Sequence, residues 1–150
     1  MLLKTRAPAW NDFIREFRET HAQTLLEPIV TACAMVAYAD GWVAPEEEKR
    51  MAALIGDFRP IEVFGTDEVL RAFNEISRRF EDDHDAGERE ALALVAELRT
   101  RPRHARVLMQ TCCAIATADG ALDGEERHAA LRLCGALGLD PEEFDLAEAR

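Results

Sequence analysis

Two stretches of the chain share one pattern: Cys33-Ala-Met-Val-Ala-Tyr-Ala-Asp40-Gly41-Trp-Val-Ala-Pro-Glu46-Glu47 and Cys112-Cys-Ala-Ile-Ala-Thr-Ala-Asp119-Gly120-Ala-Leu-Asp-Gly-Glu125-Glu126. In both, an alanine-rich apolar run ends in Ala-Asp-Gly, and a pair of glutamates follows after the same interval. Equivalent positions are separated by 79 residues throughout. A constant offset over so many positions predicts an internal duplication of one structural unit.

The rest of the chain has the apolar spacing of amphipathic helices. Val69, Phe73, Ile76 and Phe80, for example, recur in steps of four and three and predict one buried helical face. A first helix is expected in residues 10–20, a second running to Ala39, and a later one from Pro102 to Gly120. Residues 81–85 predict an acidic turn.

Helix boundaries are marked by local signals. Starts are predicted at Pro45, Thr66, Pro102, Asp140 and the capping-box patterns Asp85–Glu88 and Asp123–Glu126, and ends at Gly41 and Gly138. Strand signals are nearly absent. The sequence therefore predicts an all-α fold: a globular bundle of seven to eight helices with an internal duplication of a helix–Asp-Gly loop–helix unit, in a single domain of residues 1–150.

The charge of the chain restricts its partners. With a net charge of −11, it lacks the basic surface that nucleic acid requires, so no nucleic-acid partner is expected. No apolar run approaches the roughly 18 residues of a spanning helix, so no direct membrane insertion is expected either. The start of the chain lacks a secretory apolar run, and the four cysteines lie in apolar helical stretches without CxxC spacing. These features predict reduced, buried thiols in a cytoplasmic protein that binds cations or another protein.

Each copy of the repeat places an aspartate, Asp40 or Asp119, at the end of a helix. The carbonyl end of the helix dipole disfavours a carboxylate there, so something must compensate in both copies. Backbone N–H groups of the loop are one candidate, because Asp commonly accepts them in turns. The other is a divalent cation such as Ca²⁺ or Mg²⁺, bound with Glu47 or Glu126 seven positions later. Turn chemistry is the simpler explanation, and both stay open.

The two glutamates differ in their local context. Glu126 forms a capping-box pattern with Asp123, whereas Glu47 has Ala44 at the matching position and no such partner. A glutamate present in both copies suggests that it faces the loop in both. An EF-hand calcium loop is excluded, because Ala121 stands where that loop needs its second ligand.

The motif Ala-Asp-Gly, with an apolar residue two positions after the glycine and a glutamate seven positions after the aspartate, resembles TerB-like tellurite-resistance domains. The same superfamily includes a domain of some DnaJ-type co-chaperones. The resemblance extends roughly from Leu25 to Phe144, and its motif positions are Asp40, Gly41, Glu47, Asp119, Gly120 and Glu126. It implies a helical, duplicated domain with acidic residues on one side, a link to tellurite and other stress responses, and binding of divalent cations or partner proteins.

Two hypotheses follow. In the first, a non-enzymatic TerB-like stress protein binds a divalent cation at Asp40, Glu47, Asp119 and Glu126. In the second, the loops are structural and the bundle is a protein-protein interaction module whose surface binds a partner. Trp42 either covers the first helix or the connector, or serves as an exposed aromatic anchor for a partner. No Gly-rich phosphate loop, nucleophile elbow or Cys-His pair in a recognisable context occurs, so no enzyme is expected.

Overall fold

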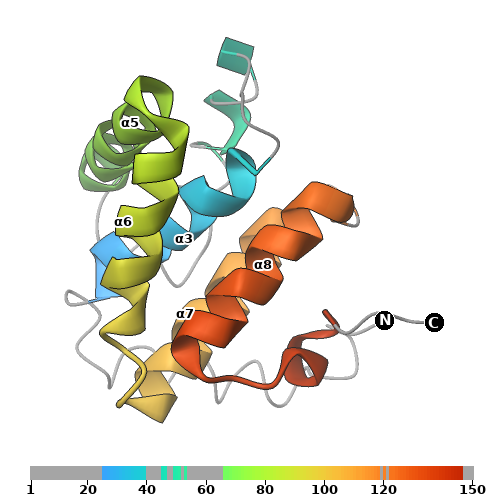
Figure 1. The fold of residues 1–150 in the computed structure, drawn as a ribbon. Coiled ribbons are helices and arrows are strands. Elements are labelled where there is room, and N and C mark those ends of the chain that lie inside the picture. Colours follow the sequence, from blue (N-terminus) through green and yellow to red (C-terminus); the bar gives the residue numbers. More distant parts are fainter. Residues whose placement is uncertain are drawn as a thin grey trace.

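Figure 1 shows the fold in a computed structural model, which describes residues 25–39, 45–46, 49–51, 53, 66–118, 120 and 122–146. Within these residues the regular elements are helices, and there is no strand. They are α3 (Leu26–Ala37), α5 (Thr66–Asp82), α6 (His84–Ala96), α7 (Pro102–Ala116), α8 (Gly124–Leu137) and the 3-10 helix η3 (Pro141–Phe144). The all-α prediction is confirmed for this part of the chain, whereas the count of seven to eight helices and the duplication stay predictions.

Several predicted boundaries can be compared with the structure. The helix predicted in residues 10–20 and the stop at Gly41 lie outside the described residues. Residues 45–46, 49–51 and 53 are helical, in agreement with a helix that opens at Pro45. Two predicted ends were too late, because α3 stops at Ala37 and α7 stops at Ala116.

The central element is α3, which lies between the α5–α6 pair and the α7–α8 pair and packs against all four helices (Figure 1). Of its residues only Glu27 is exposed, and even Val30 and Met35 on different sides are 0% and 2% exposed. A helix that is apolar all round belongs in the core, and its alanines let the neighbouring helices approach closely.

The helices α5 and α6 follow each other with a break of one residue, Asp83. The predicted face of α5 is confirmed, since Val69, Phe73, Ile76 and Phe80 are all buried. The acidic turn predicted at 81–85 is reduced to the single break at Asp83, and the capping box at Asp85–Glu88 was wrong. Instead Asp83 has extended φ and ψ and accepts the N–H of Ala86 through its side chain, at 3.2 Å, so the cap lies two residues earlier.

The last two helices follow their local signals more closely. Pro102 starts α7, and Gly138, at φ 72°, ends α8 in the left-handed region that glycine tolerates. Asp140 then caps η3 by accepting the N–H of Glu142 at 3.0 Å. Phe144, the last residue of η3, and Leu146 after it are both buried and complete the core beside α7.

Candidate functional site

The second Asp-Gly loop is the better described of the two. At its start the hydroxyl of Thr117 donates to the Cys113 carbonyl at 2.7 Å, and the N–H of Gly120 donates to the Thr117 carbonyl at 3.1 Å. Gly120 has φ 144°, a conformation that residues with a side chain rarely adopt. The glycine of the motif is therefore required by the backbone of this loop. Asp119 lies outside the described residues.

The loop ends in a capping box at the start of α8, as predicted. The N–H of Asp123 donates to Oε1 of Glu126 at 2.9 Å, and the N–H of Glu126 donates to Oδ1 of Asp123 at 2.7 Å. Both bonds satisfy amides that have no partner within the helix. Glu126 thus has a structural role that needs no metal.

The approach to the first loop is fixed by tertiary contacts. The hydroxyl of Tyr38 donates to Oε2 of Glu81 at 2.9 Å, and the Tyr38 ring stacks on Phe80 with centroids 5.3 Å apart. Nε2 of His84 lies 2.7 Å from the Tyr38 carbonyl oxygen. Because a carbonyl only accepts, Nε2 must carry the proton. The residues that follow, Asp40, Gly41 and Glu47, lie outside the described residues, as does Trp42.

Sequence reasoning missed the role of His84 in this arrangement. It belonged to the predicted acidic turn and has no metal-ligand spacing to another histidine or cysteine. Its partner Tyr38 is 46 residues away, so no local signal could have indicated the contact.

The described residues do not by themselves form a metal-binding site. Among them, no group of three or more His, Cys, Asp or Glu side chains is placed to hold an ion. Of the predicted ligands only Glu126 is described, and Asp40, Glu47 and Asp119 are not. The predicted donor set consists of carboxylates, which are the ligands that Ca²⁺ and Mg²⁺ prefer.

The cysteines are free thiols in or against the core, as predicted. Cys33, Cys112 and Cys134 are buried, and Cys113 is partly buried. A hydrogen bond with the Cys33 thiol, together with burial, raises the pKa of Cys112 well above its ordinary value. Burial raises the pKa of Cys134 to about 11 and raises that of Cys113 as well. Thiols that resist ionisation are poor nucleophiles, so this cluster is suited to packing.

The fold and loops define an acidic, helical protein with an Asp-Gly loop leading into a capped helix. Comparison with known families agrees with this class: residues 26–149 match the family described as "Tellurite resistance protein TerB", and the chain belongs to that family. It is 27% identical over 85 residues to "Tellurium resistance protein TerB" from Alcaligenes sp., a span of 57% of this chain and 70% of the relative. No solved structure gives a significant match. Within the described residues, no helix combines the length and apolar character that crossing a membrane requires.

Proposed function

We propose that this chain is a non-enzymatic stress-response protein of the tellurite-resistance type that works in the cytoplasm. We propose further that its Asp-Gly loops bind a divalent cation, Ca²⁺ or Mg²⁺, through Asp40, Glu47, Asp119 and Glu126. The observation that carries the first part is the TerB family match over residues 26–149, which includes both copies of the loop motif. The family is generally not a catalytic one, which supports a binding function.

The charge and the loop chemistry support cation binding. The capping box uses Oδ1 of Asp123 and Oε1 of Glu126, and each carboxylate has a second oxygen outside those two bonds. Asp119 lies only a few positions earlier, on a loop whose backbone turns at Gly120. A hard cation would neutralise carboxylates that otherwise repel each other in an already acidic chain.

The capping box also favours a second candidate function. Because it accounts for Glu126 without a metal, the loops are also explained as structural connections in a protein-protein interaction module. On that hypothesis, the partner contacts the surface of the bundle and metal has no effect.

Titration of the chain with Ca²⁺ and Mg²⁺, followed by ¹H–¹⁵N NMR, separates the two functions. Cation binding predicts saturable shifts at Gly120 and Asp123 that are absent in the double variant Asp40→Asn, Asp119→Asn. The double variant Glu75→Gln, Glu142→Gln removes the same charge from exposed sites elsewhere and should keep the response. Absence of shifts at millimolar metal would reject the cation site and leave the interaction module.

The tellurite-resistance part is tested in cells. A strain that has lost its own copy of this gene should grow on tellurite when the wild-type chain is restored. If the loop variant restores growth equally well while losing the metal response, the cation has no part in resistance.

A further inference from the structure

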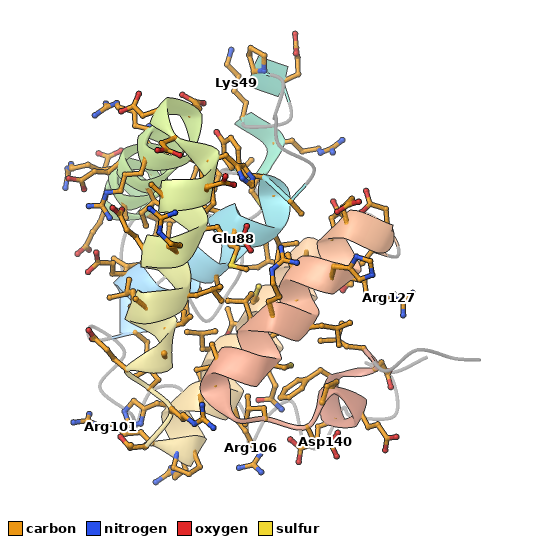
Figure 2. The ribbon with its side chains drawn as sticks, viewed as in Figure 1. Lys49, Glu88, Arg101, Arg106, Arg127 and Asp140 are labelled. Carbon is orange, nitrogen blue, oxygen red and sulfur yellow. The ribbon has the colours of Figure 1, made fainter. Side chains whose placement is uncertain are left out.

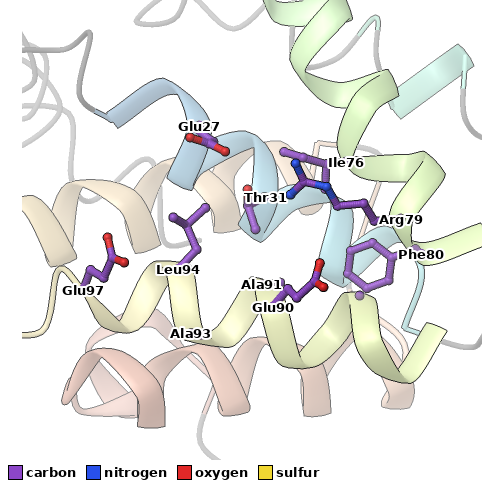
Figure 3. Close-up of a pocket in the computed structure, with 11 residues that line it drawn as sticks. Glu27, Thr31, Ile76, Arg79, Phe80, Glu90, Ala91, Ala93, Leu94 and Glu97 are labelled. Carbon is purple, nitrogen blue, oxygen red and sulfur yellow. The ribbon is translucent and has the colours of Figure 1, made fainter. Parts of the chain in front are cut away.

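A cavity of about 340 Å³ lies between α3, α5 and α6, and the first half of α3 contributes Glu27 and Thr31 to its lining (Figure 3). Its floor is apolar and consists of buried or partly buried residues: Ile76, Phe80, Gly87, Ala91 and Leu94. Small-ligand pockets begin at about this volume and share such an apolar floor.

The charged side chains at the cavity are mostly acidic. Glu27 on α3, Glu90 on α6 and Glu97, the C-cap residue of α6, are exposed carboxylates that line it, with Arg79 on α5 as the cation. No ion pair joins any of these four to another side chain in the described part of the chain. Glu90 and the C-cap residue Glu97 are seven positions apart, which corresponds to about 10 Å along the axis of α6. The opening therefore carries surplus negative charge that is free to pair with a ligand.

A buried polar group adds an independent observation. Thr31 also lines the cavity and is 3% exposed, and its hydroxyl has no hydrogen-bond partner among the residues that the structure describes. Figure 3 shows its side chain on the α3 wall, between Leu94 and Arg79. An unpartnered buried hydroxyl lowers the stability of the fold, and a ligand that brings an N–H group to it would recover part of that loss.

We propose that this cavity binds a linear aliphatic diamine. Its methylene chain lies on the apolar floor, its ammonium groups pair with the carboxylates of Glu27, Glu90 and Glu97, and one N–H reaches the Thr31 hydroxyl. Arg79 repels this ligand and limits its affinity. None of the described residues that line the cavity belongs to an Asp-Gly loop motif, so this proposal does not rest on the proposed cation binding.

Three five-carbon probes of equal chain length test the charge requirement by NMR titration. Cadaverine should give saturable shifts at Thr31, Ala91 and Leu94, and added NaCl should weaken its binding. Neutral 1,5-pentanediol and anionic glutarate should give none in the same concentration range. Equal shifts with cadaverine and the diol would overturn the proposal, because charge would then play no part.

Nα-acetyl-lysine methylamide carries one ammonium and should bind more weakly than cadaverine. Equal or tighter binding would assign the cavity to a lysine side chain of a protein instead.

Variants test the residues. Glu90→Gln should weaken cadaverine binding by about two- to fivefold, the value of an exposed ion pair, and Arg79→Gln should strengthen it. Thr31→Val keeps the shape of the side chain without the hydroxyl, so it should weaken binding while leaving the fold intact. The matched control Glu125→Gln removes the same charge from the start of α8, outside the cavity. If Glu125→Gln weakens binding as much as Glu90→Gln, the effect is general charge and the proposed site is wrong.

Discussion

The Nε atom of Arg132 lies 2.6 Å from Oε2 of Glu88, so one ion pair joins α8 to α6. Figure 2 shows Glu88 in the space between these two helices. The Arg132 side chain is 44% exposed and that of Glu88 is 23% exposed. The ion pair is therefore intermediate between a surface pair that solvent screens and a fully buried pair. We expect Arg132→Met to reduce the free energy of unfolding by about 1 kcal/mol, measured by urea denaturation. A double-mutant cycle with Glu88→Gln that gives no coupling would contradict this assignment.

One of the two predicted capping boxes was wrong and the other is present in the structure. The pattern at Asp85–Glu88 satisfies the capping-box rule, but Asp83 is an equally acceptable cap and Glu88 is drawn to Arg132 on another helix. At Asp123–Glu126 both hydrogen bonds of the capping box form. The capping-box pattern therefore predicted that a helix starts nearby, but it did not decide between two acidic residues that can both act as the cap.

The features of the candidate sites also differ in how far they could be predicted from the sequence. The bend at Gly120 and the capped start of α8 were predictable, because they depend on residues within one loop. The His84–Tyr38 contact and the cavity at Thr31 were not, because each is assembled from helices far apart in the sequence. Hydrophobic periodicity indicates which face of a helix is buried, but it does not say which helix covers that face.

Gly87 provides a test of the close approach between α5 and α6. A Cβ at this position would lie 3.0 Å from Cα of Phe80 and 3.1 Å from its ring, so the backbone itself would have to move. We expect Gly87→Ala to destabilise the fold by about 1–3 kcal/mol even though alanine favours helices. Gly135→Ala in α8 is the matched control, because a Cβ there meets no described atom within 4 Å apart from its own helix backbone and chain neighbours, and it should stabilise by about 0.5–1 kcal/mol. Equal effects in thermal unfolding would show that helix propensity, not packing, decides both.

The capping box separates the structural role of the second loop from cation binding. Asp123→Ala removes the acceptor of the Glu126 N–H and should lower stability by about 0.5–2 kcal/mol without any metal present. Glu126→Gln keeps an oxygen for the Asp123 N–H and should leave stability nearly unchanged while removing one carboxylate. Urea denaturation in EDTA measures both. A large loss in Glu126→Gln under these conditions would mean that its charge stabilises the loop, which the hydrogen bonds alone do not explain.

The buried thiols should make the fold sensitive to alkaline pH. Burial raises the pKa of Cys134 to about 11, and the pKa values of Cys112 and Cys113 are raised too. An unfolded thiol ionises near pH 8.5, so above that pH the unfolded state loses protons that the folded state retains. The contribution of the Cys134 thiol to the free energy of unfolding is therefore fully present below about pH 8.5. Above that pH it falls by about 1.4 kcal/mol per pH unit until the pH approaches the pKa of the folded state. Lysine and tyrosine titrate in the same range, so the wild-type chain is compared with Cys134→Ala. The cavity in this variant lowers its free energy of unfolding at every pH. Between pH 9 and about 10.5, however, that free energy should fall less steeply than in the wild-type chain, by about 1.4 kcal/mol per pH unit. Parallel curves for the two proteins in urea denaturation would show that Cys134 ionises equally easily in the folded and unfolded chains.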